Sequence, residues 1–180
     1  MKATGIVRRI DDLGRIVIPK EIRRTMHIRE GDPLEIFTAK DGEVIFKKYS
    51  PMGEFSDFAA HMCETLNKTT GYVAAVADRD SIIAVSGAPA REVVEKRISN
   101  ELERLMEDRQ IYQYRPGGKL VPVAAGDDKY KLALAAPIIS EGDVMGGVMF
   151  LSDSDAPESG EVEYKLAQTI AGFLGRQLSN

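Results

Sequence analysis

The chain has 180 residues, of which 43% are hydrophobic and 29% are charged, with one cysteine and a net charge of −4. This composition is typical of a soluble protein of one or two domains; no apolar run approaches the ~20 residues of a membrane span, and Met1–Thr4 lack the apolar core of a signal peptide. The lone Cys63 excludes an internal disulfide and fits a reducing compartment, so we expect a cytoplasmic protein with no membrane partner.

The charge is unevenly distributed along the chain. Residues 1–50 contain 11 Lys/Arg and 8 Asp/Glu, a net charge of +3, whereas residues 51–180 contain 13 and 20, a net charge of −7. Attraction to phosphate depends on the field within a Debye length of about 8–10 Å, so a remote acidic region need not cancel it. Six positive charges in residues 5–24 favour an anionic partner, and an ordinary solvated face is the alternative.

The first 26 residues predict a hairpin followed by a short helix. Two β-branched runs, 6–10 and 16–18, flank Asp11–Gly14, where Gly14 can adopt the positive φ of a hairpin bend. Pro19 ends the second strand and suits the first turn of a helix. The segment 21–26 (EIRRTM) then predicts one or two helical turns, with Ile22 and Met26 on the buried side and two arginines on the outer side.

A second hairpin completes a module of about 50 residues. After a Gly- and Pro-containing loop at 28–33, we expect strands at 34–38 and 44–47 joined by Asp41-Gly42, a pair typical of turns in which both central residues have positive φ. Fifty residues bury too little surface for comfortable stability, and short apolar strands leave open edges. Pairing with a second copy would remove both problems, so we expect a dimer.

These residues resemble the swapped-hairpin DNA-binding domain of the AbrB-like transition-state regulators, a family that includes the antitoxin MazE. The resemblance rests on Gly14–Pro19 followed by Glu21–Arg24, which give turn, strand, stop and helix in the family's order. It implies a homodimer whose hairpins interleave into one β-barrel and present arginines to double-stranded DNA. The positions that match the family's basic residues are Arg8, Arg15, Arg23 and Arg24, with Lys2 and Arg9 as flanking contacts; strand alternation alone does not choose Arg8 over Arg9.

Beyond residue 50 the pattern becomes helical. Pro51 and Gly53 interrupt regular structure, so we expect a DNA-binding domain at 1–50, a linker at 51–55 and a second domain at 56–180. Apolar residues at three- and four-residue spacing predict helices at about 54–68 and 159–178, the latter without a capping box. Their apolar stripes suit a helical bundle with another copy, and a purely intrachain core is the alternative.

Between these helices the sequence predicts an antiparallel sheet. Apolar runs at 72–77 and 82–85 predict a hairpin, a helix follows at about 91–108, a short edge strand at 121–123, and two strands at 131–139 and 144–151. The fold class is therefore α+β, an antiparallel sheet covered by helices. The order of elements, with Ala135–Ile139 and Gly146–Leu151, resembles a GAF domain. This resemblance implies a role in ligand sensing or oligomerisation. If the barrel and the helices pair with different copies, we expect a homotetramer.

The sequence contains no constellation typical of catalysis, and we expect neither enzyme activity nor a cofactor. His27 and His61 are too isolated for a zinc site, and Cys63 on an apolar helix face favours a structural thiol. The glycine pairs at 117–118 and 146–147 lack the spacing of a phosphate loop, and the acidic pair at 127–128 favours loop solvation over an ion site.

The favoured function is a bacterial DNA-binding transcription regulator that, by resemblance, activates and represses genes during sporulation, with an unidentified small-molecule effector or none. The alternative is an antitoxin-type protein-binding module. Such antitoxins end in an extended, disordered tail, whereas residues 54–180 carry long apolar stripes and can form a core. A cyclic-nucleotide sensor of the phosphodiesterase-linked kind lacks its catalytic domain here.

Overall fold

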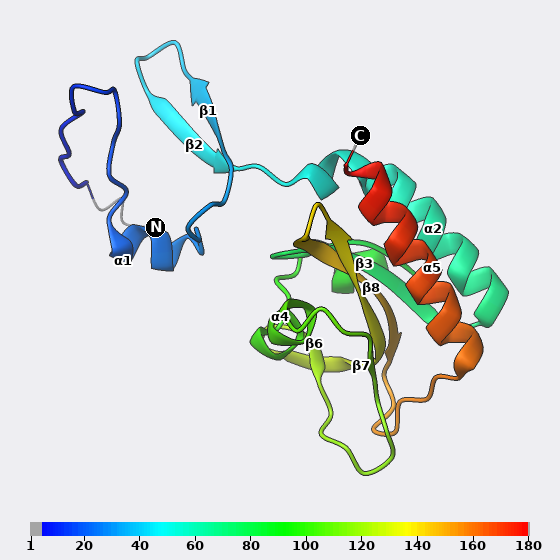
Figure 1. The fold of residues 1–180 in the computed structure, drawn as a ribbon. Helices are drawn as coiled ribbons and strands as arrows, with labels where there is room; N and C mark the ends of the chain where they lie inside the picture. The colour runs from blue at the N-terminus through cyan, green and yellow to red at the C-terminus, as the bar shows by residue number, and fades with distance from the viewer. Residues whose placement is uncertain (1–4, 180) are drawn as a thin grey trace. The chain divides into compact units, whose positions relative to one another are not determined.

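The computed structural model describes residues 5–179 and divides the chain into two units, residues 1–49 and 50–180 (Figure 1). The first unit contains one short helix, α1 (Lys20–Thr25), and a two-stranded sheet formed by β1 (Leu34–Thr38) and β2 (Val44–Lys48). The strands are antiparallel, with Ile36 opposite Phe46. The predicted second hairpin and the position of the helix are confirmed.

The turn between β1 and β2 differs from the expected two-residue type. Gly42 has a φ of 85°, but Asp41 does not share this positive φ. The Gly42 N–H donates to the Ala39 carbonyl at 3.1 Å, and the Ala39 N–H donates to the Glu43 carbonyl at 3.0 Å. These bonds define a longer loop in which a type I turn is followed by a left-handed glycine, a common alternative for hairpins.

The first hairpin has the same turn but not the predicted strands. Gly14 has a φ of 77°, its N–H donates to the Asp11 carbonyl at 3.0 Å, and the Asp11 N–H donates to the Arg15 carbonyl at 3.1 Å. The flanking runs 6–10 and 16–18 are extended without strand pairing in the single chain. The prediction of two strands is therefore wrong for the isolated chain, because an extended run becomes a strand only where a partner backbone completes its ladder.

The first unit has almost no interior. Pro19 is the one buried residue among those described up to residue 49, while Val7 is 93% and Val17 is 72% exposed. Met26, which we expect on the buried side of α1, is exposed. Arg23, which we expect outside, is half-buried, and its Nε is shielded from solvent without a hydrogen-bond partner among residues 5–179. The helix has no core of its own chain to face.

The second unit is built on an antiparallel sheet with strand order β4-β3-β8-β7-β5, and β6 pairs with β7. All strands expected in this region are present, and β5 is an addition too short to be visible in the sequence pattern. The bounds are β3 (Val73–Asp78), β4 (Ile82–Ser86), β5 (Tyr112–Gln113), β6 (Pro122–Ala124), β7 (Asp127–Ser140) and β8 (Asp143–Ser152).

Two long helices cover one face of this sheet. The helices α2 (Ser56–Thr70) and α5 (Glu161–Gln177) lie side by side in Figure 1 and contact each other and the sheet. Residues 51–55, expected as a linker, form the 3-10 helix η1 (Pro51–Phe55), because Met52 is completely buried in the core beneath α2. The Gly160 N–H donates to Glu163 Oε2 at 2.7 Å, so α5 has the carboxylate half of a capping box that we did not expect.

The single helix predicted at 91–108 is wrong, since the structure has two short helices there, α3 (Ala90–Val93) and α4 (Asn100–Glu107). The intervening backbone instead bonds the sheet edge: the Glu95 N–H donates to the Ile82 carbonyl at 2.8 Å, and the Ile82 N–H donates to the Lys96 carbonyl at 3.0 Å. Ser99 then starts α4 by accepting the Leu102 N–H on its Oγ at 3.0 Å.

Each face of the sheet carries its own core. Under α2 and α5, residues such as Cys63, Phe150 and Leu174 form one buried cluster. On the other face, Leu102 of α4 packs with Met149 and Leu151 in a second cluster. The sheet is thus buried on both sides, which a chain of about 130 residues can achieve alone.

Candidate nucleic-acid interface

Among the candidate arginines, Arg15 has a side chain whose position an ion pair defines. It follows the first turn, and its Nε donates to Asp11 Oδ2 at 2.8 Å. The other carboxylate oxygen of Asp11, Oδ1, accepts the backbone N–H groups of Leu13 at 3.0 Å and Arg15 at 2.8 Å. These hydrogen bonds from Arg15 and Leu13 lower the pKa of Asp11. The Arg15 side chain remains 70% exposed, so its guanidinium is held at Nε yet open to a ligand.

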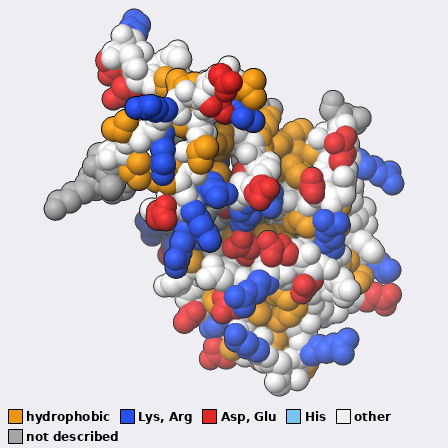
Figure 2. All heavy atoms as spheres, turned by 60° about the vertical axis from the view of Figure 1, so that its left-hand side comes forward, with side chains coloured by type: hydrophobic (Ala, Val, Ile, Leu, Met, Phe, Trp, Pro, Cys, Tyr) orange, Lys and Arg blue, Asp and Glu red, His pale blue; other side chains and the backbone are white. Residues whose placement is uncertain are grey.

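The remaining candidate residues lie on the same unit in two groups. Arg8 and Arg9 are exposed on the extended segment before the turn, and Arg24 is exposed in the last turn of α1, next to the half-buried Arg23. Lys2 lies outside the described residues. Figure 2 shows that Lys and Arg, Asp and Glu, and hydrophobic side chains are interspersed over much of the visible surface.

A groove of about 590 Å³ runs between the first extended segments, α1 and β2 of this unit. Among the described residues its lining is almost entirely apolar, with Arg8 as the one charged member. The lining residues are Ile6, Arg8, Ile16, Val17, Ile18, Pro19, Ile22, Met26, Ile28, Val44, Ile45 and Phe46.

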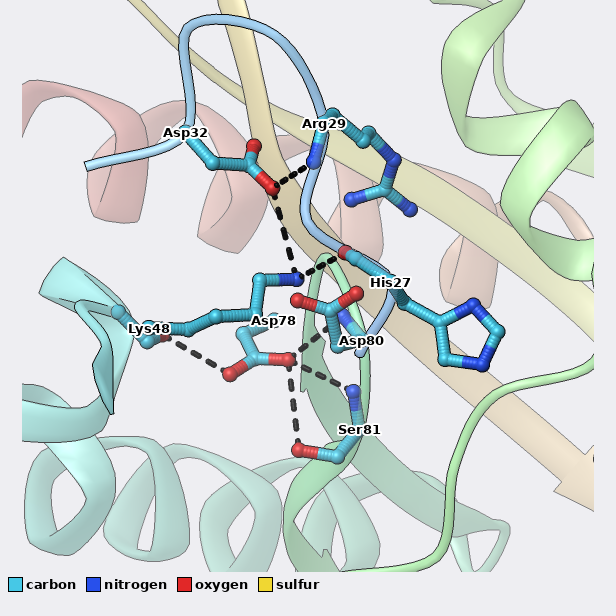
Figure 3. A network of polar contacts seen from close by, with 8 residues as sticks. His27, Arg29, Asp32, Lys48, Asp78, Asp80 and Ser81 are labelled. Atoms are coloured by element: carbon cyan, nitrogen blue, oxygen red, sulfur yellow. Dashed lines mark hydrogen bonds and ion pairs between the residues drawn. The ribbon is translucent and has the colours of Figure 1, made fainter. Parts of the chain in front are cut away.

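Polar contacts fix the end of β2 to the loop after α1. Lys48 Nζ donates to the His27 carbonyl at 2.8 Å and lies 3.5 Å from Asp32 Oδ2, which also accepts the Arg29 N–H at 2.8 Å (Figure 3). These bonds set the position of α1 against the second hairpin. Nothing in the residue pattern marks Lys48 or Asp32 for this structural role, because each also contacts a backbone group, which any residue carries.

In the second unit, Asp78 organises the turn between β3 and β4. Its carboxylate accepts the N–H groups of Asp80 at 2.8 Å and Ser81 at 2.7 Å, and the Ser50 hydroxyl at 2.9 Å (Figure 3). Asp78 is buried, and these donors compensate its lost hydration.

A small cavity lies on the face of the sheet under α3. This cavity, lined by residues including Ile82, Val93 and Tyr130, has a volume of about 10 Å³, close to the room one water needs. Ion pairs Lys96–Asp127 and Lys129–Glu92 join the segment around α3 to β7 at its rim. Side chains of the chain itself therefore fill most of the space around these residues.

Within residues 5–179, no group of three His, Cys, Asp or Glu side chains is placed to hold a metal ion, and no helix is long and apolar enough to cross a membrane. Burial raises the pKa of Cys63 to about 12, as expected for a structural thiol.

Comparison with known proteins identifies both units. A family described as "Antidote-toxin recognition MazE, bacterial antitoxin" matches residues 7–53, and transition state regulatory protein AbrB of Bacillus subtilis (strain 168) is 54% identical over 63 residues, 32% of this chain and 65% of that protein. The family "Stage V sporulation protein T C-terminal, transcription factor" matches residues 54–179. The class is a transcription regulator with an AbrB-type N-terminal DNA-binding domain.

The second unit has a GAF-like fold. The GAF domain of an Acinetobacter phosphoenolpyruvate-protein phosphotransferase shares it with a TM-score of 0.52 and 14% identity, over 74% of this chain and 84% of that one. A type II free methionine-R-sulfoxide reductase from Thermoplasma acidophilum has a TM-score of 0.53 and 14% identity, over 71% of this chain and 94% of that one. The second of these is an enzyme, but identities this low show only a shared fold.

One relative spans both units. Stage V sporulation protein T of Bacillus subtilis (strain 168) is 49% identical over 178 residues, 99% of each chain. The chain therefore belongs to the stage V sporulation protein T family. The resemblances to AbrB-like and GAF proteins are confirmed, and the antitoxin alternative is not favoured, because residues 54–179 match a transcription factor family and form two cores.

Proposed function

We propose that the first units of two copies pair into one β-barrel that binds double-stranded DNA through Arg8, Arg15, Arg23 and Arg24, with Lys2 and Arg9 as flanking contacts. The protein would regulate sporulation genes in the cytoplasm, activating some and repressing others. The observation that carries the proposal is the joint exposure of apolar and basic side chains on a unit with one described buried residue. A second copy would fill the groove of about 590 Å³ while leaving Arg15 and Arg24 open.

A second interface would join these dimers into a tetramer. Val162 on α5 is 62% exposed, and Phe173, three turns along the same helix, contacts Phe58 of α2 with ring centroids 5.8 Å apart while remaining open to solvent. An exposed apolar stripe on two adjacent helices suits a bundle with the same helices of another copy. Two barrels on one particle would raise the avidity for paired DNA sites.

We propose oligomerisation as the role of the second unit. This is supported by the exposed apolar residues of α5 and by the small volume, about 10 Å³, of the cavity under α3. A small-molecule effector would have to open this space and bind the open form better than the closed one. A saturable rise in melting temperature with one compound of a metabolite screen, together with a changed DNA affinity, would assign a sensing role instead.

The DNA interface is tested by the salt dependence of binding. In the intact protein, Arg15→Ala and Arg24→Ala should each weaken binding to a duplex fragment. Each phosphate contact that a variant loses should also lower the slope of log K against log salt by about 0.9, doubled in a dimer. Lys119→Ala, which removes an exposed charge from the second unit, is the matched control. Unchanged affinity and slope in every arginine variant would refute the interface.

A further inference from the structure

Asp11 is the acidic residue most closely bound to the candidate DNA-binding surface. It lies at the start of the first turn, and its two carboxylate oxygens perform different tasks. Oδ1 accepts the N–H groups of Leu13 at 3.0 Å and Arg15 at 2.8 Å and so closes the turn, which also needs the left-handed Gly14. Oδ2 accepts Arg15 Nε at 2.8 Å.

The contact with Asp11 restricts the Arg15 side chain without using the N–H donors of its terminal guanidinium nitrogens. A guanidinium has five N–H donors, and the contact to Asp11 uses the one at Nε, so it leaves the four N–H donors of the two terminal nitrogens unused. The side chain is 70% exposed, so these nitrogens are accessible. Binding of an unrestrained arginine would cost side-chain entropy, whereas one already held in place loses less.

Charge alone would make Asp11 unfavourable on a DNA-binding surface. A carboxylate beside an arginine opposes phosphate attraction, and an ion pair exposed at this level contributes little to folding stability. Phosphate attraction needs positive charge near the backbone but little orientation. Base recognition needs two donors held in a fixed direction, as in the bidentate contact of an arginine with guanine.

We propose that Asp11 is a positioning residue for sequence discrimination: it holds Arg15 at Nε so that the terminal guanidinium nitrogens are presented to base edges from the hairpin tip. The inference rests on the proposed DNA-binding function and concerns how that site distinguishes one sequence from another. Asp11 would lower the affinity for DNA in general and raise the preference for the correct sequence.

The neighbouring carboxylate provides a matched control. Asp12 is exposed and makes no hydrogen bond or ion pair with the part of the chain that is described. Asp12→Asn removes the same charge one residue away without releasing Arg15. In Asp11→Asn, the side-chain carbonyl can still accept the backbone N–H groups of Leu13 and Arg15. The amide nitrogen that replaces the second oxygen is a donor, so the hydrogen bond from Arg15 Nε is lost.

The experiment compares two duplexes with the full-length protein. One is enriched from a random library by the unchanged protein, and the other is a shuffled sequence of equal length and composition. Asp11→Asn should reduce the ratio of the two affinities about two- to tenfold for each Arg15 engaged, while affinity for the shuffled duplex stays equal or rises. Asp12→Asn should raise both affinities alike and keep the ratio. In an Arg15→Ala background, Asp11→Asn should leave the ratio unchanged.

An unchanged ratio in Asp11→Asn, with or without a lower melting temperature, would overturn the inference and leave Asp11 as a turn-forming residue only. This outcome is distinct from failure of the proposed function. If Arg15→Ala and the other arginine variants bound both duplexes as the unchanged protein does, the DNA interface itself would be misplaced. Weakened binding in Arg15→Ala with a constant ratio in Asp11→Asn contradicts the positioning role alone.

Discussion

The two units of this chain have similar hydrophobic contents and very different interiors. Of the first 50 residues, 20 are hydrophobic, close to the 43% of the whole chain. Yet Pro19 is the one buried residue described up to residue 49, whereas the second unit buries two clusters on the two faces of its sheet. Composition therefore does not explain the difference.

Length and organisation explain it better. The second unit has enough strands to place an antiparallel sheet between helical layers, so its apolar residues find partners in the same chain. The first unit has one two-stranded sheet, and two isolated strands are at best marginal in water. The second unit is a complete fold, and the first is half of one whose other half we assign to a second copy.

The largest expected effect comes from placing a charge on each proposed interface. Ile16→Asp puts a carboxylate in the apolar groove of the first unit, where burial without a partner is costly. Light scattering of the intact protein should show half the mass of the proposed tetramer, with loss of DNA binding. Val162→Asp on α5 should also halve the mass but keep the barrel, so DNA binding weakens through lost avidity.

Exposed polar positions on the same elements serve as controls. Thr38→Asp on β1 and Gln168→Asp on α5 add the same charge outside the groove and the apolar stripe. Both should retain the mass and the DNA affinity of the unchanged protein. If Ile16→Asp behaved as Thr38→Asp does, the first unit would not need a partner, and the contrast between the units would be wrong.

A smaller effect tests how completely the second unit is packed. Gly175 and Gly172 lie on the same helix, α5, but a Cβ at Gly175 would come within 2.2 Å of the Ile139 carbonyl oxygen, whereas one at Gly172 would meet nothing within 4 Å. Gly175→Ala should lower the free energy of unfolding by about 1–3 kcal/mol through overpacking. Gly172→Ala should raise it by roughly 0.5–1 kcal/mol, since alanine favours the helix. Urea titration of both variants measures the difference, and equal effects would contradict a close-packed interface between α5 and β7.

The sequence predicts those elements whose partners lie in the same chain. The hairpin of β1 and β2, the long helices α2 and α5, and the strands β3, β4, β7 and β8 follow from apolar spacing and turn residues. The strands expected at 6–10 and 16–18 have the same kind of pattern, but their backbone partners are absent from a single chain. The apolar pattern indicates which residues can be buried. It does not indicate whether residues of the same chain or of a second copy bury them.

One error has a different cause. The helix expected at 91–108 is interrupted because the backbone of Glu95 and Lys96 bonds to Ile82 at the sheet edge, a tertiary contact with no local signal. Residues 51–55, which we expect as a linker, form a 3-10 helix in which Met52 is buried. At the candidate site, the choice of arginines rests on family resemblance. The bonds between Asp11 and Arg15 depend on the geometry of the first turn, and the only sequence signal for that turn is the order Asp11-x-x-Gly14-Arg15.

The smallest expected effect concerns alkaline pH and belongs to the second unit alone. Burial raises the pKa of Cys63 from an ordinary value of 9.0 to about 12, so the folded state holds the thiol proton more tightly than the unfolded state does. The resulting stability is complete below pH 9 and is lost as the pH rises from 9 toward 12. Between pH 9 and 10 the free energy of unfolding should fall by about 1 kcal/mol from this thiol. Because lysines and tyrosines also titrate there, the measurement is the difference between the unchanged protein and Cys63→Ala, whose unfolding should lack this part of the slope. Equal slopes in the two proteins would mean that the thiol reaches solvent, and that the core beneath α2 is looser than its burial indicates.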